Sequence, residues 1–262
     1  MKIIKNWFQH RKQKISVIKD LRSLLSISAK DMEVIWQNFD RFYQQQEYAR
    51  KLGESKTLNC LESFVTYVML ASHRPASIIE IGTYYGKSTR RIIDMKKMLG
   101  LEAPVTCYDI CNDVSFFKPE EAKLVLADIT PDPTKFLSEH SAPQFIFFDA
   151  RPYDLIKNVV LSCLNELPEA VMIMHDCSPS LCRREMETDR SDLDISSSTG
   201  VWERHVLAEC FNVSDPISHK LNSIATSTHQ LIIFDTEHGL ALLVPNNLIR
   251  SLAGKAAQFL IP

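Results

Sequence analysis

The chain has few glycines and no long hydrophobic run. Only seven of its 262 residues are glycine, well under the average usage of about 7 %. No apolar stretch approaches the 18 residues of a membrane span, and the N-terminal segment lacks the continuous apolar core of a signal peptide. We therefore expect neither secretion nor a membrane span, and we predict a cytoplasmic protein.

Cysteine usage agrees with that prediction. The seven cysteines are scattered and include no Cys-x-x-Cys pair, so we expect small buried side chains in a reducing compartment and no disulfide framework. Cys107 with Cys111 and Cys177 with Cys182 are loose groupings that match no usual zinc-site spacing.

Basic charge is concentrated at the N-terminus. Residues 1–22 carry seven Lys and Arg side chains against one acid, Asp20, whereas the whole chain has a net charge of −2. Apolar residues recur between these cations at near-helical spacing: Ile4, Trp7, Phe8, Ile15, Ile18 and Leu25. Such a helix either packs its apolar stripe on the protein body or lies on an anionic membrane surface or an acidic partner. With a second amphipathic stretch at 31–51, it predicts an N-terminal helical appendage over residues 1–55.

From residue 56 onward, short apolar strands alternate with helical stretches. The predicted strands are 77–82, 104–109, 123–128, 144–149, 170–175, 229–235 and 240–244, and the main predicted helices are 57–72, 87–99, 132–139 and 154–167. The alternation predicts an α/β domain over residues 56–262, with a doubly wound, mostly parallel, seven-stranded sheet covered on both faces. The last two strands predict a C-terminal antiparallel hairpin. The polar segment 183–199 predicts a flexible lid.

Two of the seven glycines enclose a turn between a predicted strand and a predicted helix. The turn is Gly82-Thr83-Tyr84-Tyr85-Gly86, followed by Lys87-Ser88-Thr89. Bare backbone and the unpaired N–H groups of a helix start favour a bound ligand here. A phosphate-binding loop has four residues between its glycines and this turn has three, and the GxGxxG fingerprint of dinucleotide binding is absent. A P-loop-like nucleotide hydrolase, with Phe145–Asp149 as its second motif, is kept as an alternative.

Acidic residues stand at the ends of the first five predicted strands. They are Glu80, Asp109, Asp128, Asp149 and Asp176. The carboxyl ends of parallel strands share one edge of the sheet, where ligands bind. An aspartate after a strand is also a common turn former or helix cap, but the series predicts an acidic rim beside the glycine turn.

These residues carry a family resemblance. The run Glu80-Ile81-Gly82-Thr83-Tyr84-Tyr85-Gly86-Lys87-Ser88 resembles the first motif of class I S-adenosylmethionine-dependent methyltransferases, in the branch of catechol O-methyltransferase and of the cephalosporin- and macrolide-tailoring O-methyltransferases. Cys107-Tyr108-Asp109, Phe147-Phe148-Asp149-Ala150 and Met174-His175-Asp176-Cys177 resemble later motifs of that branch in the same order. The likeness covers residues 57–245 and implies a Rossmann-like fold and methyl transfer, most naturally to oxygen.

The resemblance also implies the cofactor contacts. The methionine portion of S-adenosylmethionine would meet the turn, with Glu80 beneath it, through Gly82, Thr83, Tyr84, Gly86 and Ser88. Asp109 would accept both ribose hydroxyls, because a carboxylate can take two hydrogen bonds. Asp128 would meet the adenine amino group, and Ile129 would pack on the ring. Asp149 would border both the cofactor and the acceptor.

The catalytic residues are predicted at the fourth and fifth strand ends. By resemblance, Asp149 and Asp176 would hold a divalent metal such as magnesium, with His175 as the third ligand or as the general base. An equal alternative is that His175 only orients Asp176 by a hydrogen bond. The chain departs from the family where Arg151 follows Asp149, because arginine is a poor base. It is instead predicted to hold an anionic group of the substrate, and metal dependence is left open.

The acceptor is not named by any motif. A charged lid without aromatic residues suits a small polar molecule or a glycan, and the acidic catalytic domain without a basic stripe argues against nucleic acid. A catalytically silent methyltransferase-like scaffold, working through the basic N-terminal helix, is the remaining alternative. The oligomeric state is left open and includes a homo-oligomer.

Overall fold

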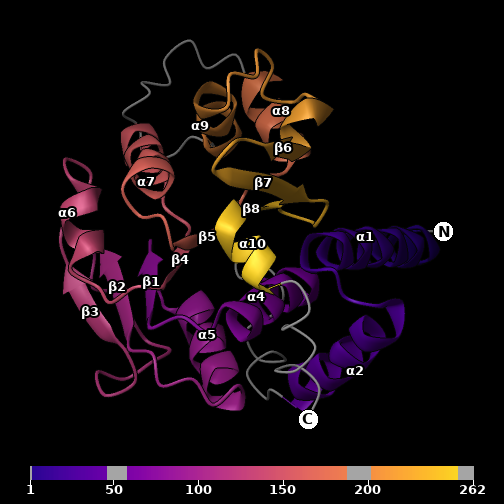
Figure 1. The fold of residues 1–262 in the computed structure, drawn as a ribbon, viewed down its shortest axis with the longest axis horizontal. Coiled ribbons are helices and arrows are strands. Elements are labelled where there is room, and N and C mark those ends of the chain that lie inside the picture. Colours follow the sequence, from indigo (N-terminus) through magenta and orange to yellow (C-terminus); the bar gives the residue numbers. More distant parts are fainter. Residues whose placement is uncertain (1, 46–57, 188–201, 253–262) are drawn as a thin grey trace.

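The structure is a computed structural model that describes residues 2–45, 58–187 and 202–252. Within these residues one mixed sheet has the strand order β3-β2-β1-β4-β5-β8-β7-β6 (Figure 1). The strands are β1 Ser77–Ile81, β2 Val105–Asp109, β3 Lys123–Leu126, β4 Gln144–Phe148, β5 Val171–Met174, β6 Ser223–Ala225, β7 His229–Phe234 and β8 Leu240–Pro245. The five strands from β3 to β5 pair in parallel, and β8, β7 and β6 add to them by antiparallel pairing.

The α/β class and the C-terminal hairpin are confirmed, but the predicted number of seven strands is wrong. The eighth, β6, has three residues and pairs only with β7, Ile224 lying opposite Leu231. So short an edge strand shows no hydrophobic alternation in the sequence, because it is defined by its partner and not by its own pattern.

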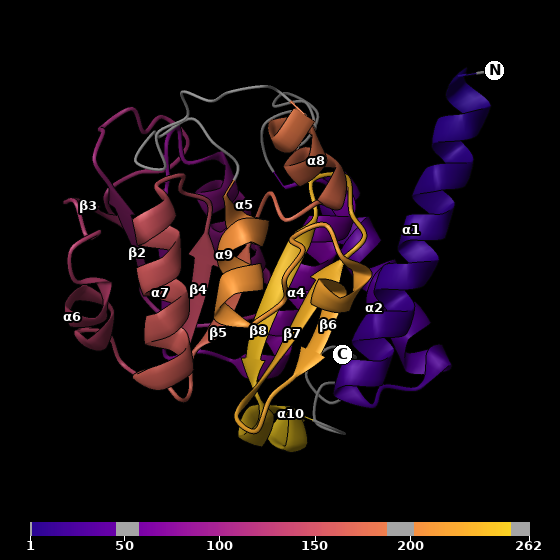
Figure 2. The ribbon, with the colours of Figure 1, turned by 90° about the horizontal axis from the view of Figure 1, so that it is seen from above.

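Two hydrophobic clusters cover the two faces of the sheet. Neighbouring residues of β4 alternate between them: Phe145 and Phe147 face one cluster, whereas Ile146 and Phe148 face the other. Figure 2 shows helices α4 and α5 on one face and α7 and α9 on the opposite face. Such double cover explains why the central strands are apolar along their whole length.

Helices flank the sheet at nearly the predicted places. Their bounds are α1 Lys2–Leu25, α2 Ala29–Gln45, α4 Cys60–His73, α5 Lys87–Met98, α6 Pro133–Ser138, α7 Tyr153–Asn165, α8 Pro179–Glu187, α9 Glu203–Cys210 and α10 Asn246–Leu252, with the 3₁₀ turn η1 at His219–Asn222. None of the helices in the described ranges is long and apolar enough to cross a membrane.

The N-terminal helices share a core with α4. Trp36 and Phe39 of α2 pack on Phe64 of α4, with ring centroids 4.8 and 5.2 Å apart. The buried face of α1 differs from the expected stripe: Val17 is fully buried, whereas Ile15 is 60 % exposed. The predicted boundary at residue 55 lies outside the described residues, so the division into two domains stays a prediction.

The predicted lid is partly helical. Helix α8 extends to Glu187, so a loop over residues 183–187 is wrong, and residues 188–199 lie outside the described ranges. Pro179 opens the helix at a position where its missing N–H costs nothing, and Cys182 anchors it in the interior.

Candidate functional site

The glycine turn is confirmed at the carboxyl end of β1, and close backbone packing explains both glycines. Gly82 and Gly86 have φ angles of +85° and +82°, a region that other residues rarely adopt. A Cβ atom on Gly82 would lie 2.2 Å from the carbonyl oxygen of Asp149, and one on Gly86 would lie 2.7 Å from the Phe117 ring. The turn is thereby pressed against the end of β4, which brings two of the predicted site segments together.

Glu80 lies beneath this turn, as predicted. Its carboxylate is fully buried and accepts hydrogen bonds from the hydroxyls of Ser88 and Thr89 at the start of α5. Burial raises the pKa of Glu80 to about 7. Because the Ser88 hydroxyl is engaged here, this residue secures the turn from below, and its predicted contact with a cofactor stays a prediction.

Asp109 organises the turn from the neighbouring strand. Its Oδ2 accepts the N–H groups of Thr83 and Tyr84, both at 2.8 Å, and its Oδ1 accepts the N–H of Cys111 at 3.0 Å. A carboxylate offers about four acceptor positions, and three are filled. Accepting two ribose hydroxyls as well would require Asp109 to give up one of these backbone bonds.

The two residues predicted for the adenine differ in their exposure to solvent. Asp128 is exposed and accepts the N–H of Thr130 at 2.9 Å, whereas Ile129 is buried in the hydrophobic cluster on the α7 face. Their roles toward an adenine stay predictions.

A cleft of about 600 Å³ opens at this edge of the sheet. It brings together the turn, the ends of β4 and β5, helix α8 and the β7–β8 hairpin. Its lining residues are Gly82, Thr83, Tyr84, Tyr85, Lys87, Ser88, Asp149, Arg151, His175, Asp176, Leu181 and His238. The predicted acid at the end of β4, the His-Asp pair after β5 and the glycine turn therefore face one space.

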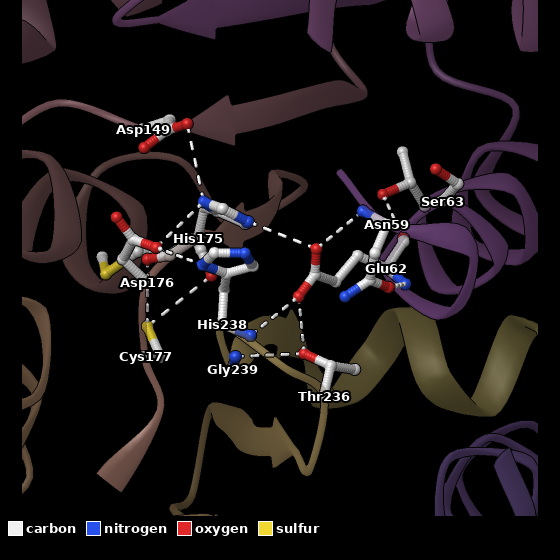
Figure 3. Close-up of polar contacts among 12 residues, drawn as sticks. Asn59, Glu62, Ser63, Asp149, His175, Asp176, Cys177, Thr236, His238 and Gly239 are labelled. Atoms are coloured by element: carbon white, nitrogen blue, oxygen red, sulfur yellow. Dashed lines mark hydrogen bonds and ion pairs between the residues drawn. The ribbon is translucent and has the colours of Figure 1, made fainter. Parts of the chain in front are cut away.

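His175 is the centre of the polar network in this cleft (Figure 3). Its Nε2 lies 3.3 Å from Glu62 Oε2, and its Nδ1 lies 3.3 Å from Asp176 Oδ1 and 3.6 Å from Asp149 Oδ2. Burial alone would lower the pKa of His175, but the charge of Asp149 and the contact with Glu62 outweigh it and raise that pKa well above its usual value.

Glu62 is a site residue that the sequence reading missed. It is fully buried on α4 and accepts four hydrogen bonds: Oε1 accepts the Thr236 hydroxyl at 2.9 Å and the His238 N–H at 3.2 Å, and Oε2 accepts the Asn59 N–H at 2.9 Å and His175 Nε2. The one sequence signal is the Asn59-x-x-Glu62 capping box that opens α4, and a capping box indicates a helix start, not a site.

His238 is a second residue of the site that the sequence reading missed. It sits in the hairpin between β7 and β8, where Gly239 packs so closely that a Cβ would lie 2.1 Å from the Ser178 backbone nitrogen. The N–H of Ser178 donates to the His238 carbonyl at 2.7 Å. This contact places His238 Nδ1 3.5 Å from Asp176 Oδ1.

Asp176 is held from several sides. Arg151 donates from Nη2 to its Oδ2 at 2.9 Å, which leaves Oδ1 turned toward His175 and His238. The φ of Asp176 is +60°, a strained value for a residue other than glycine and one that is enriched at functional sites. Arg151, predicted to hold an anionic substrate group, is here the ion-pair partner of Asp176.

Solved structures of other proteins resemble this fold. A structure from Staphylococcus aureus, assigned as a caffeoyl-CoA O-methyltransferase, matches with a TM-score of 0.52 and 12 % identity, over 80 % of this chain and 99 % of that one. TomG from Streptomyces achromogenes, an O-methyltransferase solved with S-adenosylmethionine, matches with a TM-score of 0.46 and 15 % identity, over 90 % and 98 % of the two chains.

CmcI, solved with magnesium and S-adenosylmethionine, matches at 25 % identity with a TM-score of 0.39, over 47 % of this chain and 55 % of its own. The match thus spans about half the length of CmcI. Comparison with family models found no match, and comparison with curated proteins found none.

Proposed function

We propose that the protein is an S-adenosylmethionine-dependent methyltransferase that acts on oxygen. The observation that carries the proposal is the contact between Gly82 and the end of β4, which joins the glycine turn to Asp149 in one cleft. The fold, shared with an assigned O-methyltransferase at a TM-score of 0.52, supports it.

The charge of the cleft suits the cofactor. S-adenosylmethionine carries a sulfonium cation, and Asp149 supplies a carboxylate on the cleft wall, whereas Asp176 is already paired with Arg151. The Thr83 hydroxyl is buried in that wall without a hydrogen-bond partner among the described residues. An unpaired buried polar group is costly, and a bound methionine portion would relieve that cost.

The same turn is unsuited to a phosphate. The N–H groups of Thr83 and Tyr84, which a phosphate loop would turn toward its ligand, donate to the Asp109 carboxylate instead. That negative charge would repel a triphosphate. The nucleotide-hydrolase alternative therefore has less support than methyl transfer.

Methyl transfer needs alignment and a nucleophilic acceptor more than it needs bond-breaking chemistry from the protein. Nε2 of His175 is engaged by Glu62, so Nδ1 is the ring atom that faces Asp149 and Asp176. Nδ1 is therefore the atom of His175 that would bind a metal or, once the ring has lost its proton, take the proton of the acceptor. We keep a small polar molecule or a glycan as the acceptor class, and nucleic acid is not expected.

Calorimetric titration of the full chain with S-adenosylhomocysteine tests the proposal. We expect saturable binding by the wild type, weakened at least about tenfold in Asp109→Ala, because the turn loses the acceptor of two N–H groups. Lys123→Ala, an exposed change on β3, is the matched control and should bind like the wild type. Absence of binding by the folded wild type, or tight binding of ATP with magnesium by the same sample, would overturn the proposal.

A further inference from the structure

We propose that the cleft binds a divalent transition metal, in preference to magnesium, through His175 Nδ1, Asp176 Oδ1 and His238 Nδ1. The inference deepens the proposed function: it rests on that function for the use of the metal, but not for its binding. We define these three residues as the His-Asp-His cluster.

The ligand atoms are already grouped. Nδ1 of His175 and Nδ1 of His238 lie 3.3 and 3.5 Å from the same oxygen, Asp176 Oδ1, and the three residues each offer a ligand atom within 4.8 Å of the other two. Metal–nitrogen and metal–oxygen bonds of about 2.0–2.2 Å place neighbouring ligand atoms roughly 3–3.5 Å apart. Asp149 Oδ2 lies 3.6 Å from His175 Nδ1 but does not belong to this group of ligand atoms.

The contact at Nε2 orients the His175 ring for metal binding through Nδ1. Glu62 Oε2 lies 3.3 Å from Nε2, so Glu62 holds that side of the ring, and a metal would bind at Nδ1 in place of the proton there. Nδ1 is buried and makes no hydrogen bond to any described residue. A carboxylate behind a histidine that ligates a metal is the common second layer of such sites, because it fixes the tautomer and raises the basicity of the ring.

Asp176 is prepared in a similar way. Arg151 occupies Oδ2 at 2.9 Å, so the carboxylate offers one oxygen toward the two rings and not a bidentate face. The backbone holds this residue at a φ of +60°, and the surrounding hairpin contacts maintain that strained conformation.

The donor set does not suit magnesium. Magnesium binds oxygen ligands in octahedral geometry and keeps several waters, whereas imidazole nitrogen suits zinc, iron, nickel and copper. Two imidazoles with one carboxylate are also the ligand set of many non-haem iron sites. His238, to which the sequence reading assigned no role, changes the predicted oxygen-rich site into a nitrogen-rich one.

The experiment measures metal binding without turnover. The full chain is treated with a chelator, desalted and titrated by calorimetry with Mn²⁺, Co²⁺, Zn²⁺ and Mg²⁺ in separate runs, and Co²⁺ binding is followed in parallel by its visible absorption spectrum. We expect one transition-metal ion per chain, bound at least about 100-fold more tightly than Mg²⁺, with Co²⁺ bands characteristic of nitrogen ligation.

Two histidine variants locate the ion. His238→Ala should lower the affinity for Co²⁺ at least about tenfold and alter its spectrum, whereas His219→Ala, an exposed histidine of η1, should change neither. Circular dichroism checks that both variants fold. Equal affinity for Mg²⁺ and the transition metals would overturn the inference, and so would unchanged Co²⁺ binding by folded His238→Ala.

A second titration separates this inference from the proposed function. The chelated wild type is titrated with S-adenosylhomocysteine alone. Metal binding without cofactor binding would overturn the methyltransferase proposal and support the metal site. Cofactor binding without metal selectivity would support the methyltransferase proposal and overturn the metal site.

Discussion

Replacing Glu62 with glutamine should destabilise the protein strongly and in a pH-dependent way. Glutamine keeps one oxygen for Thr236 and the His238 N–H, but it turns an amide NH₂ toward the N–H of Asn59 and toward His175 Nε2. The glutamine NH₂ then faces two other donors in a fully buried position, and the ion pair with His175 is lost. Breaking a buried pair by removing one partner costs about 3–5 kcal/mol.

The pH window follows from the two pKa shifts. Burial raises the pKa of Glu62, but the hydrogen bond and charge of His175 outweigh it and hold that pKa below its usual 4.5; the stability from Glu62 is therefore present above about pH 4.5 and lost as the pH falls. The pKa of His175 is raised, so its contribution is complete below about pH 6.5 and is lost as the pH rises through the folded-state value. The contributions of Glu62 and His175 to stability are therefore both complete between about pH 4.5 and pH 6.5.

Urea denaturation of the wild type and Glu62→Gln at about pH 6 and pH 9 measures this effect. The loss of unfolding free energy should be greater at pH 6, because the raised pKa keeps His175 charged there, whereas the ring that loses its proton as the pH rises can accept the glutamine NH₂ at Nε2. Asn59→Ala is the matched control: it removes the side-chain cap of the Glu62 N–H but keeps the Glu62–His175 pair, and should cost about 1 kcal/mol at either pH. A loss below about 1 kcal/mol in Glu62→Gln, or one equal at both pH values, would refute the reasoning.

Two further predictions concern the glycine turn. Because burial raises the folded-state pKa of Glu80 to about 7 from 4.5, its contribution to stability is present below pH 4.5 and lost as the pH rises through 7. Glu80→Gln should therefore remove roughly 3 kcal/mol of the fall in unfolding free energy between about pH 4.5 and pH 8, and an unchanged urea pH profile would contradict this. Gly82→Ala should abolish S-adenosylhomocysteine binding and cost several kcal/mol, whereas Gly100→Ala, with a φ of +58° and nothing within 4 Å of the added Cβ, should cost only about 1–2 kcal/mol in thermal unfolding; similar losses in the two would show that close packing at Gly82 is unimportant.

Much of the fold was predictable because its signals are local. The apolar run of β4 and the glycine pair of the turn each indicate their local structure within five residues. All seven predicted strands are found. The missed strand, β6, has only three residues and is defined by its pairing with β7. The prediction of a loop from residue 183 is wrong over its first residues, because α8 is stabilised by burial of Cys182 and not by its own polar pattern.

The sequence by itself determined which residues end the strands, and so it placed Asp149, His175 and Asp176 at one edge with the glycine turn. Only the tertiary structure decided their chemistry. Glu62 is 113 residues from His175 along the chain, and His238 reaches Asp176 through a hairpin whose Gly239 fits against Ser178. Strand ends are encoded by short apolar runs and the polar residues that follow them, whereas a contact between distant segments depends on how the helix, the hairpin and the sheet pack. That packing joins a capping glutamate and a hairpin histidine to the site.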